Sequence, residues 1–217
     1  MRQGVIFDMD GVLVDNRDIH IEAFVVLCKK YGVTLSKEKL FGVFGMGNDE
    51  ILPIILPDKL IKEKGLRPLA EEKEAIYREI FEKTIVPTPG LVPFLHALRK
   101  EGFRTAVGSS GMEANVRFVL EKCGIADCFD AVVNGDMVTR CKPDPEIFLT
   151  ASRLMQVPPT ECVVIEDSFA GIQAARNAGM GVIAMATTFS KDKLKATDND
   201  MIVSDFTPLT PRIIRSL

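Results

Sequence analysis

The sequence predicts an α/β protein with a Rossmann-like parallel sheet at its core and an inserted α-helical domain. Short apolar runs rich in Val and Ile alternate with helical patterns through most of the chain, which is typical of a parallel sheet covered by helices. The apolar runs largely lack the alternation of half-exposed strands, as expected for strands buried on both faces. Between residues 15 and 87 this order is interrupted by helical patterns alone, which indicates the insert.

The elements follow from these patterns and from the glycines that end helices. The expected strands are Gly4–Phe7, Arg104–Val107, Ala131–Val133, Cys162–Ile165, Gly181–Ala184 and the less pronounced Met201–Val203. The expected core helices are Pro93–Lys100, Met112–Cys123, Pro145–Met155 and Ala170–Ala178. The insert shows helical patterns at Ile19–Tyr31, Asn48–Ile55 and Leu69–Ile85. We therefore expect residues 1–14 and 88–217 to form the core and residues 15–87 to form a helical cap.

Composition excludes several classes of function. A net charge of −3 and a pI near 5.5 lack the basic signature of a nucleic-acid-binding protein. No apolar run has the length of a membrane span, and the N-terminal residues do not resemble a signal peptide. The five scattered cysteines have no partners that would complete a zinc site. We expect a cytoplasmic monomer with free thiols and no nucleic-acid or membrane partner.

Polar residues follow the expected strands at the point where each strand ends. Ligands of open parallel sheets bind beyond these carboxyl ends. A lysine, Lys142, lies in the loop after the third strand. The residues that follow the first, second and fourth strands are Asp8, Met9, Asp10, Gly11, Ser109, Ser110, Gly111, Glu166 and Asp167. Four carboxylates, two hydroxyls and one ammonium are thus expected at one rim.

This combination of residues points to phosphoryl transfer. Crowded carboxylates repel one another unless a cation neutralises them, and Mg²⁺ prefers oxygen ligands. With the cation bound, Asp8 could attack phosphorus and form an aspartyl-phosphate. Asp10 could protonate the leaving oxygen and then deprotonate the attacking water or alcohol. Lys142, Ser109 and backbone N–H groups of the first loop would hold the charge that develops on the phosphoryl oxygens.

Each feature alone has an ordinary structural interpretation. An Asp-Gly pair is usually a turn, Lys142-Pro143 could be a solvated loop, and Glu166-Asp167 could cap the helix that follows. The arrival of all these features in order at successive strand ends favours the chemical interpretation.

At this point the residues resemble the haloacid dehalogenase superfamily of phosphatases. Asp8–Leu13 resembles its first motif, Ser109 its second, Lys142 its third and Glu166-Asp167 its fourth. The resemblance implies that Asp8 is the nucleophile, Asp10 the acid/base, and Ser109 and Lys142 the phosphate-binding residues. It also implies that Mg²⁺ is held by the Asp8 and Asp167 carboxylates and the Asp10 backbone carbonyl, with Glu166 a ligand or the partner of one. The dehalogenases themselves lack a carboxylate at the position of Asp10, so carbon–halogen hydrolysis is disfavoured. The position of the cap matches the C1 type.

Within the superfamily the chain is most similar to the beta-phosphoglucomutase-like subgroup, through Asp15, His20, the run Glu166–Ile172 and the cap segment Phe44–Glu50. The resemblance implies that His20, Gly45 and Asn48 bind substrate, and Lys73 is a looser match to a mutase cap lysine. Met9, Gly11, Ser110 and Gly111, in the loops around the nucleophile, are further candidates for substrate binding. The mutase has a lysine and an arginine where this chain has Phe44 and Asn48, which leaves a second phosphate poorly neutralised.

The leading hypothesis is therefore a phosphatase of a small phosphorylated metabolite, such as a sugar phosphate. The nearest alternative is a beta-phosphoglucomutase that interconverts β-glucose 1-phosphate and glucose 6-phosphate. A remote alternative is a phosphate-binding protein without catalysis. The presence of Asp10 beside Asp8 speaks against it, because binding alone needs no second carboxylate there.

Overall fold

The computed structural model describes residues 1–35 and 47–217. The chain forms two compact units, which we call the core unit, residues 1–15 with 85–217, and the helical unit, residues 16–84. The expected cap, residues 15–87, overlaps the helical unit.

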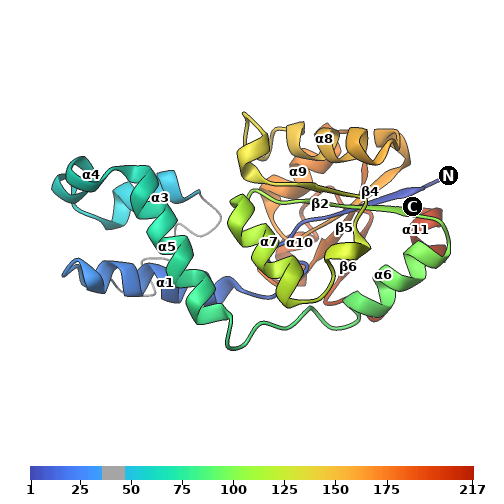
Figure 1. Cartoon of the computed structure of the whole chain (residues 1–217). Coiled ribbons are helices and arrows are strands. Elements are labelled where there is room, and N and C mark those ends of the chain that lie inside the picture. Colours follow the sequence, from blue (N-terminus) through green and yellow to red (C-terminus); the bar gives the residue numbers. More distant parts are fainter. Residues whose placement is uncertain (36–46) are drawn as a thin grey trace. The chain divides into compact units, whose positions relative to one another are not determined.

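The core unit is built on one parallel sheet (Figure 1), and all six predicted strands are present. In chain order they are β1 Gly4–Phe7, β2 Arg104–Gly108, β3 Ala131–Val133, β4 Cys162–Glu166, β5 Gly181–Met185 and β6 Met201–Val203. Their order across the sheet is β3-β2-β1-β4-β5-β6, and every neighbouring pair is parallel. The predicted fold class is confirmed.

The register of the sheet places the polar residues at one edge. Phe7, the last residue of β1, pairs with Val107 of β2 and with Ile165 of β4. The residues that follow these partners therefore emerge side by side at the carboxyl edge. The chain also changes direction here, because it builds β2 and β3 on one side of β1 and then crosses to β4 on the other. Such a switch point is where ligands of open α/β sheets bind.

Six α-helices of the described chain belong to the core unit. They are α6 Leu91–Lys100, α7 Glu113–Lys122, α8 Glu146–Met155, α9 Phe169–Asn177, α10 Lys191–Leu194 and α11 Pro211–Ser216. The four predicted core helices match α6 to α9 with small shifts at their ends. The short helices α10 and α11 were not predicted, because each has too few residues to show a helical period.

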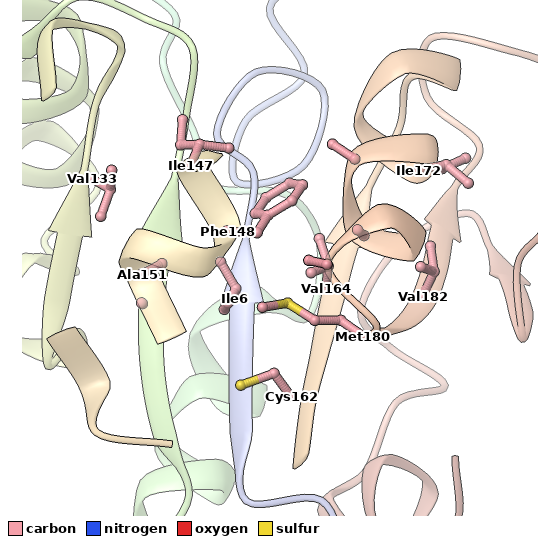
Figure 2. Packing of buried hydrophobic residues seen from close by; sticks show 14 of the residues in the cluster. Ile6, Val133, Ile147, Phe148, Ala151, Cys162, Val164, Ile172, Met180 and Val182 are labelled. Atoms are coloured by element: carbon pink, nitrogen blue, oxygen red, sulfur yellow. The ribbon is translucent and has the colours of Figure 1, made fainter. Parts of the chain in front are cut away.

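Different helices cover the two faces of the sheet, and each face has its own set of buried side chains. Figure 2 shows Phe148 of α8 and Ile172 of α9 packed with Ile6 and Val164 of the strands in one buried cluster. On the opposite face Phe7 contacts other aromatic rings, with centroid distances of 6.3 Å to Phe94 of α6 and 5.9 Å to Phe206. Successive residues of β1 thus point into two separate apolar layers, which explains why the strand has no polar alternation.

The described part of the helical unit contains helices only, namely α1 Arg17–Lys30, α3 Asn48–Ile55, α4 Asp58–Lys64 and α5 Leu66–Phe81. Helix α5 begins earlier than predicted, because Pro68 fits the first turn of a helix, and it ends at Phe81 rather than Ile85. Helix α4 was not predicted. None of the helices in residues 1–35 and 47–217 has the length and apolar character needed to cross a membrane. The five cysteines are free thiols, as predicted.

Candidate active site

The Lys142 ammonium joins the carboxyl ends of three strands. Its Nζ donates hydrogen bonds to Asp8 Oδ1 at 2.7 Å, to Glu166 Oε1 at 2.9 Å and to the Gly108 carbonyl oxygen at 3.2 Å. These acceptors lie just after β1, at the end of β4 and at the end of β2. An ammonium has three N–H donors, so all three are used. Burial opposes its charge, but the Asp8 and Glu166 carboxylates outweigh burial and raise the pKa of Lys142.

Three buried carboxylates form an acidic cluster in the core unit. Oxygens of Asp8, Glu166 and Asp167 lie within 4.8 Å of one another. Burial, together with repulsion from Glu166 and Asp10, raises the pKa of Asp8 to about 7 despite the attraction of Lys142. Burial and repulsion from Glu166 and Asp8 also raise the pKa of Asp167. One lysine therefore does not balance the charge of the cluster, and its all-oxygen donor set suits a hard divalent cation.

The loop after β1 is folded tightly against this cluster. The Met9 carbonyl oxygen accepts hydrogen bonds from the backbone N–H groups of Val12, Leu13 and Val14. The Met9 side chain is fully buried, so it packs in the core and only its backbone remains a candidate for binding substrate. Gly11 adopts φ +73°, and a Cβ added there would lie 2.1 Å from Asp167 Oδ2. Gly11 thus leaves room for the Asp167 carboxylate.

Replacing Gly11 with Ala is expected to displace the Asp167 carboxylate and to weaken Mg²⁺ binding by at least about tenfold. Gly179→Ala is the matched control, because Gly179 has φ +74° but no atom within 4 Å of an added Cβ. Both variants carry the backbone strain, and only Gly11→Ala carries the clash. Titration calorimetry with Mg²⁺ measures the difference, and equal affinities in the two variants would contradict this explanation of Gly11.

The loop after β2 lies beside the loop after β1. Ser109 is buried, and its Oγ accepts a hydrogen bond from the Gly111 N–H at 3.0 Å. A Cβ added at Gly111 would lie 3.2 Å from Met9 Cε and 3.8 Å from Asp10 Oδ2. Gly111 therefore allows the two loops to approach closely, next to the predicted acid/base residue. Ser110 is exposed.

Glu166 is held by more than Lys142. Its Oε2 accepts the Ser168 N–H at 2.6 Å, and a Cβ added at Gly171 of α9 would lie 1.6 Å from its Oε1. The side chain that caps α9 is Ser168, whose Oγ accepts the Gly171 N–H at 3.0 Å. Helix capping by Glu166-Asp167 is therefore not the arrangement found. Glu166 instead orients the Lys142 ammonium.

Two supporting residues, Glu146 and Thr188, were not predicted from the sequence. Glu146 accepts hydrogen bonds from the Thr139 and Arg140 N–H groups and from Thr139 Oγ1, at 2.9 to 3.1 Å, and so orders the loop that carries Lys142. Thr188, after β5, donates a hydrogen bond that opposes the rise in the pKa of Asp167. Thr188 follows the fifth strand, and its place just after a strand end is the signal that points to it. No spacing signal points to Glu146.

The predicted cap residues His20, Lys73 and Asn48 meet in the helical unit. Lys73 Nζ lies 2.8 Å from His20 Nδ1 and 2.9 Å from Glu74 Oε1. Asn48 Nδ2 donates to the same Glu74 oxygen at 2.7 Å. The His20 ring stacks on Tyr77 with centroids 4.1 Å apart. Gly45 lies outside the described residues.

Glu74 is a charged residue of this cluster that the sequence did not suggest. Burial alone would raise its pKa, but the Lys73 and His20 charges and the Asn48 hydrogen bond more than offset burial and lower the pKa of Glu74. The buried Lys73 ammonium is therefore paired with a carboxylate that remains ionised.

Comparisons with known proteins identify the family and agree with the fold. The model of the haloacid dehalogenase-like hydrolase family matches residues 5–185. The chain is a haloacid dehalogenase-like hydrolase. Its relatives place this hydrolase in the beta-phosphoglucomutase-like subgroup and identify it as a phosphatase or phosphotransferase. Its acidic cluster could bind a divalent metal ion.

Several relatives cover most of the hydrolase. It is 34% identical over 184 residues to a fructose-1-phosphate phosphatase of Escherichia coli, covering 83% of this chain and 94% of the relative. It is 30% identical over 190 residues to a beta-phosphoglucomutase of Bacillus subtilis, covering 84% and 83%. The crystal structure of a beta-phosphoglucomutase from Clostridium difficile matches with a TM-score of 0.83 at 28% identity, over 100% of this chain and 96% of that one.

One relative is much longer than the hydrolase. The chain is 35% identical over 207 residues to the SUPPRESSOR OF QUENCHING 1 protein of Arabidopsis thaliana, which covers 93% of this chain. The match spans only 19% of that relative's length.

Proposed function

We propose that this hydrolase is a Mg²⁺-dependent phosphatase that hydrolyses a small phosphorylated metabolite, a sugar phosphate, through an aspartyl-phosphate on Asp8. The observation that carries the proposal is the position of the Asp8 carboxylate, which contacts Lys142 within a cluster of three buried carboxylates. A carboxylate buried for structural reasons alone would be matched by one counter-charge, whereas this cluster has an excess of negative charge.

The Asp8 and Asp167 carboxylates and the Asp10 backbone carbonyl would hold Mg²⁺, with Glu166 as a ligand or as the partner of Lys142. Bound Mg²⁺ would supply positive charge that neutralises the carboxylates and the phosphoryl oxygens. Such neutralisation is what permits an anionic substrate to approach an anionic nucleophile.

The reaction would proceed in two steps on Asp8. First, an Asp8 carboxylate oxygen attacks phosphorus, the ester P–O bond breaks, and Asp10 donates a proton to the departing alcohol. Second, Asp10 removes a proton from water, the water oxygen attacks the same phosphorus, and the bond between phosphorus and the Asp8 oxygen breaks to release phosphate. Lys142 would give up one of its three present hydrogen bonds and donate to a phosphoryl oxygen as charge develops there.

The cluster in the helical unit supports water, rather than a second sugar phosphate, as the acceptor. A mutase must hold a bisphosphate intermediate and needs cations for the phosphate that is not reacting. In the described helical unit Lys73 is paired with Glu74, and the Asn48 side chain donates to the same carboxylate. We propose that the helical unit is the cap.

The experiment that tests the function is a Mg²⁺-dependent screen of sugar phosphates, nucleotides and pyrophosphate for release of inorganic phosphate, with EDTA as the control. A parallel coupled assay follows glucose 6-phosphate formed from β-glucose 1-phosphate in the presence of catalytic bisphosphate. Phosphate release that depends on Mg²⁺ supports the proposal. Isomerisation faster than phosphate release would identify a beta-phosphoglucomutase instead.

A further inference from the structure

A stacked pair of aromatic rings, one exposed and one partly buried, is carried by segments of the core unit that adjoin residues of the acidic cluster. Phe169, the first residue of α9, is 43% exposed and stacks on Phe189 with ring centroids 4.3 Å apart and an interplanar angle of 25°. Among the described residues, Phe169 is the only aromatic side chain among the large apolar side chains that are exposed. Phe169 therefore keeps much of its ring surface in solvent while it stacks on the partly buried Phe189.

Both rings are carried by segments that hold the acidic cluster. Phe169 follows Asp167 by two residues, and the intervening Ser168 N–H binds Glu166 at 2.6 Å. The loop that carries Phe189 is attached to the site by the two threonines that precede it: Thr187 Oγ1 donates to the Gly11 carbonyl oxygen at 2.5 Å, and Thr188 hydrogen-bonds Asp167. The stacked pair is thus built on the carboxyl ends of β4 and β5, at the same edge of the sheet as Asp8.

The chemistry of the pair suits one kind of leaving group. An aromatic face attracts flat or ring-shaped groups that offer C–H bonds. The same ring electrons attract cations, and Lys193 Nζ lies 5.9 Å from the Phe189 centroid. A cyclic sugar offers such a C–H face on its ring and hydroxyl groups around it. A leaving group without a ring gains little from this surface.

We propose that Phe169 and Phe189 form a stacking surface for the ring of a cyclic sugar in the leaving group, and so favour cyclic sugar phosphates over phosphate esters without a ring. This proposal rests on the proposed phosphatase function and narrows its substrate class. Phe169 is the specificity-determining residue, because it is the more exposed ring of the pair.

The test compares kcat/KM for three probes, glucose 6-phosphate, fructose 1-phosphate and acetyl phosphate, whose leaving group has no ring. The quantity compared is kcat/KM for a cyclic sugar phosphate divided by kcat/KM for acetyl phosphate. We expect Phe169→Ala to lower this ratio by about three- to tenfold, mainly because KM for the cyclic probe rises. Phe169→Tyr keeps the aromatic face and is expected to restore the ratio. Leu154→Ala is the matched control, because Leu154 in α8 is also 43% exposed, and it is expected to leave the ratio unchanged.

The outcomes separate this proposal from the function on which it rests. If acetyl phosphate is hydrolysed but Phe169→Ala leaves the ratio unchanged, or the cyclic probes are not hydrolysed at all, the stacking proposal is overturned and the phosphatase stands. A similar loss of ratio in Leu154→Ala, or no recovery in Phe169→Tyr, would also overturn it. If the unaltered protein hydrolyses none of the three probes with Mg²⁺, both proposals fail.

Discussion

Asp8→Asn is expected to lower kcat for every phosphate ester by at least about 10⁴-fold, because an amide is too weak a nucleophile to attack phosphorus. Asn has nearly the same size and shape as Asp, so we expect the fold to be unchanged. It also removes a negative charge that burial, Glu166 and Asp10 together disfavour by more than the attraction of Lys142 favours it. The metal-free variant should therefore be no less stable than the unaltered protein, and thermal unfolding checks this.

Asp192→Asn is a suitable control for Asp8→Asn, because the Asp192 side chain is 88% exposed and pairs only at the surface with Lys195. It should leave kcat unchanged. Hydrolysis retained in Asp8→Asn at a similar rate to Asp192→Asn would show that Asp8 is not the nucleophile.

Lys142→Met is expected to impair both activity and stability. Loss of the ammonium that would hold the phosphoryl oxygens should lower kcat/KM by about 10²- to 10³-fold. It also leaves the buried Asp8 and Glu166 carboxylates without their shared counter-charge, which should lower the free energy of unfolding by about 3 kcal/mol. Steady-state kinetics and urea unfolding of the metal-free protein measure the two effects.

The matched control for Lys142→Met is Lys195→Met, which breaks an ion pair whose side chains are 70% and 88% exposed. Surface pairs of this kind contribute little to stability, typically below about 1 kcal/mol. If the two variants have the same unfolding free energy, Lys142 does not offset the charge of the acidic cluster in the way described above.

The sheet could be predicted from the sequence because its strands are buried on both faces. Runs such as Val163–Ile165 contain only large apolar residues, and they stand out against the amphipathic helices around them. The short helices α4, α10 and α11 could not be predicted in the same way, because their formation depends on tertiary packing more than on a repeated pattern.

The residues proposed for the chemistry could be predicted because parallel strands bring their carboxyl ends to one edge. Asp8, Lys142 and Glu166 are far apart in the chain, yet each follows a recognisable apolar run. Supporting residues have no such signal. Glu146 and Glu74 act through contacts that depend on the final packing of a loop and of α5. Nothing in the sequence indicates that Phe169 stacks on Phe189, because the two residues lie in different segments.

The central claim, that Asp8 carries the phosphoryl group between the two steps, is tested most directly by rapid acid quench during turnover followed by mass spectrometry of the peptides. We predict a phosphoryl group on the peptide that contains Asp8, on that residue, in the Mg²⁺-loaded unaltered protein and none in Asp8→Asn. A protein that turns over substrate while its phosphoryl group is found on another residue would contradict the claim.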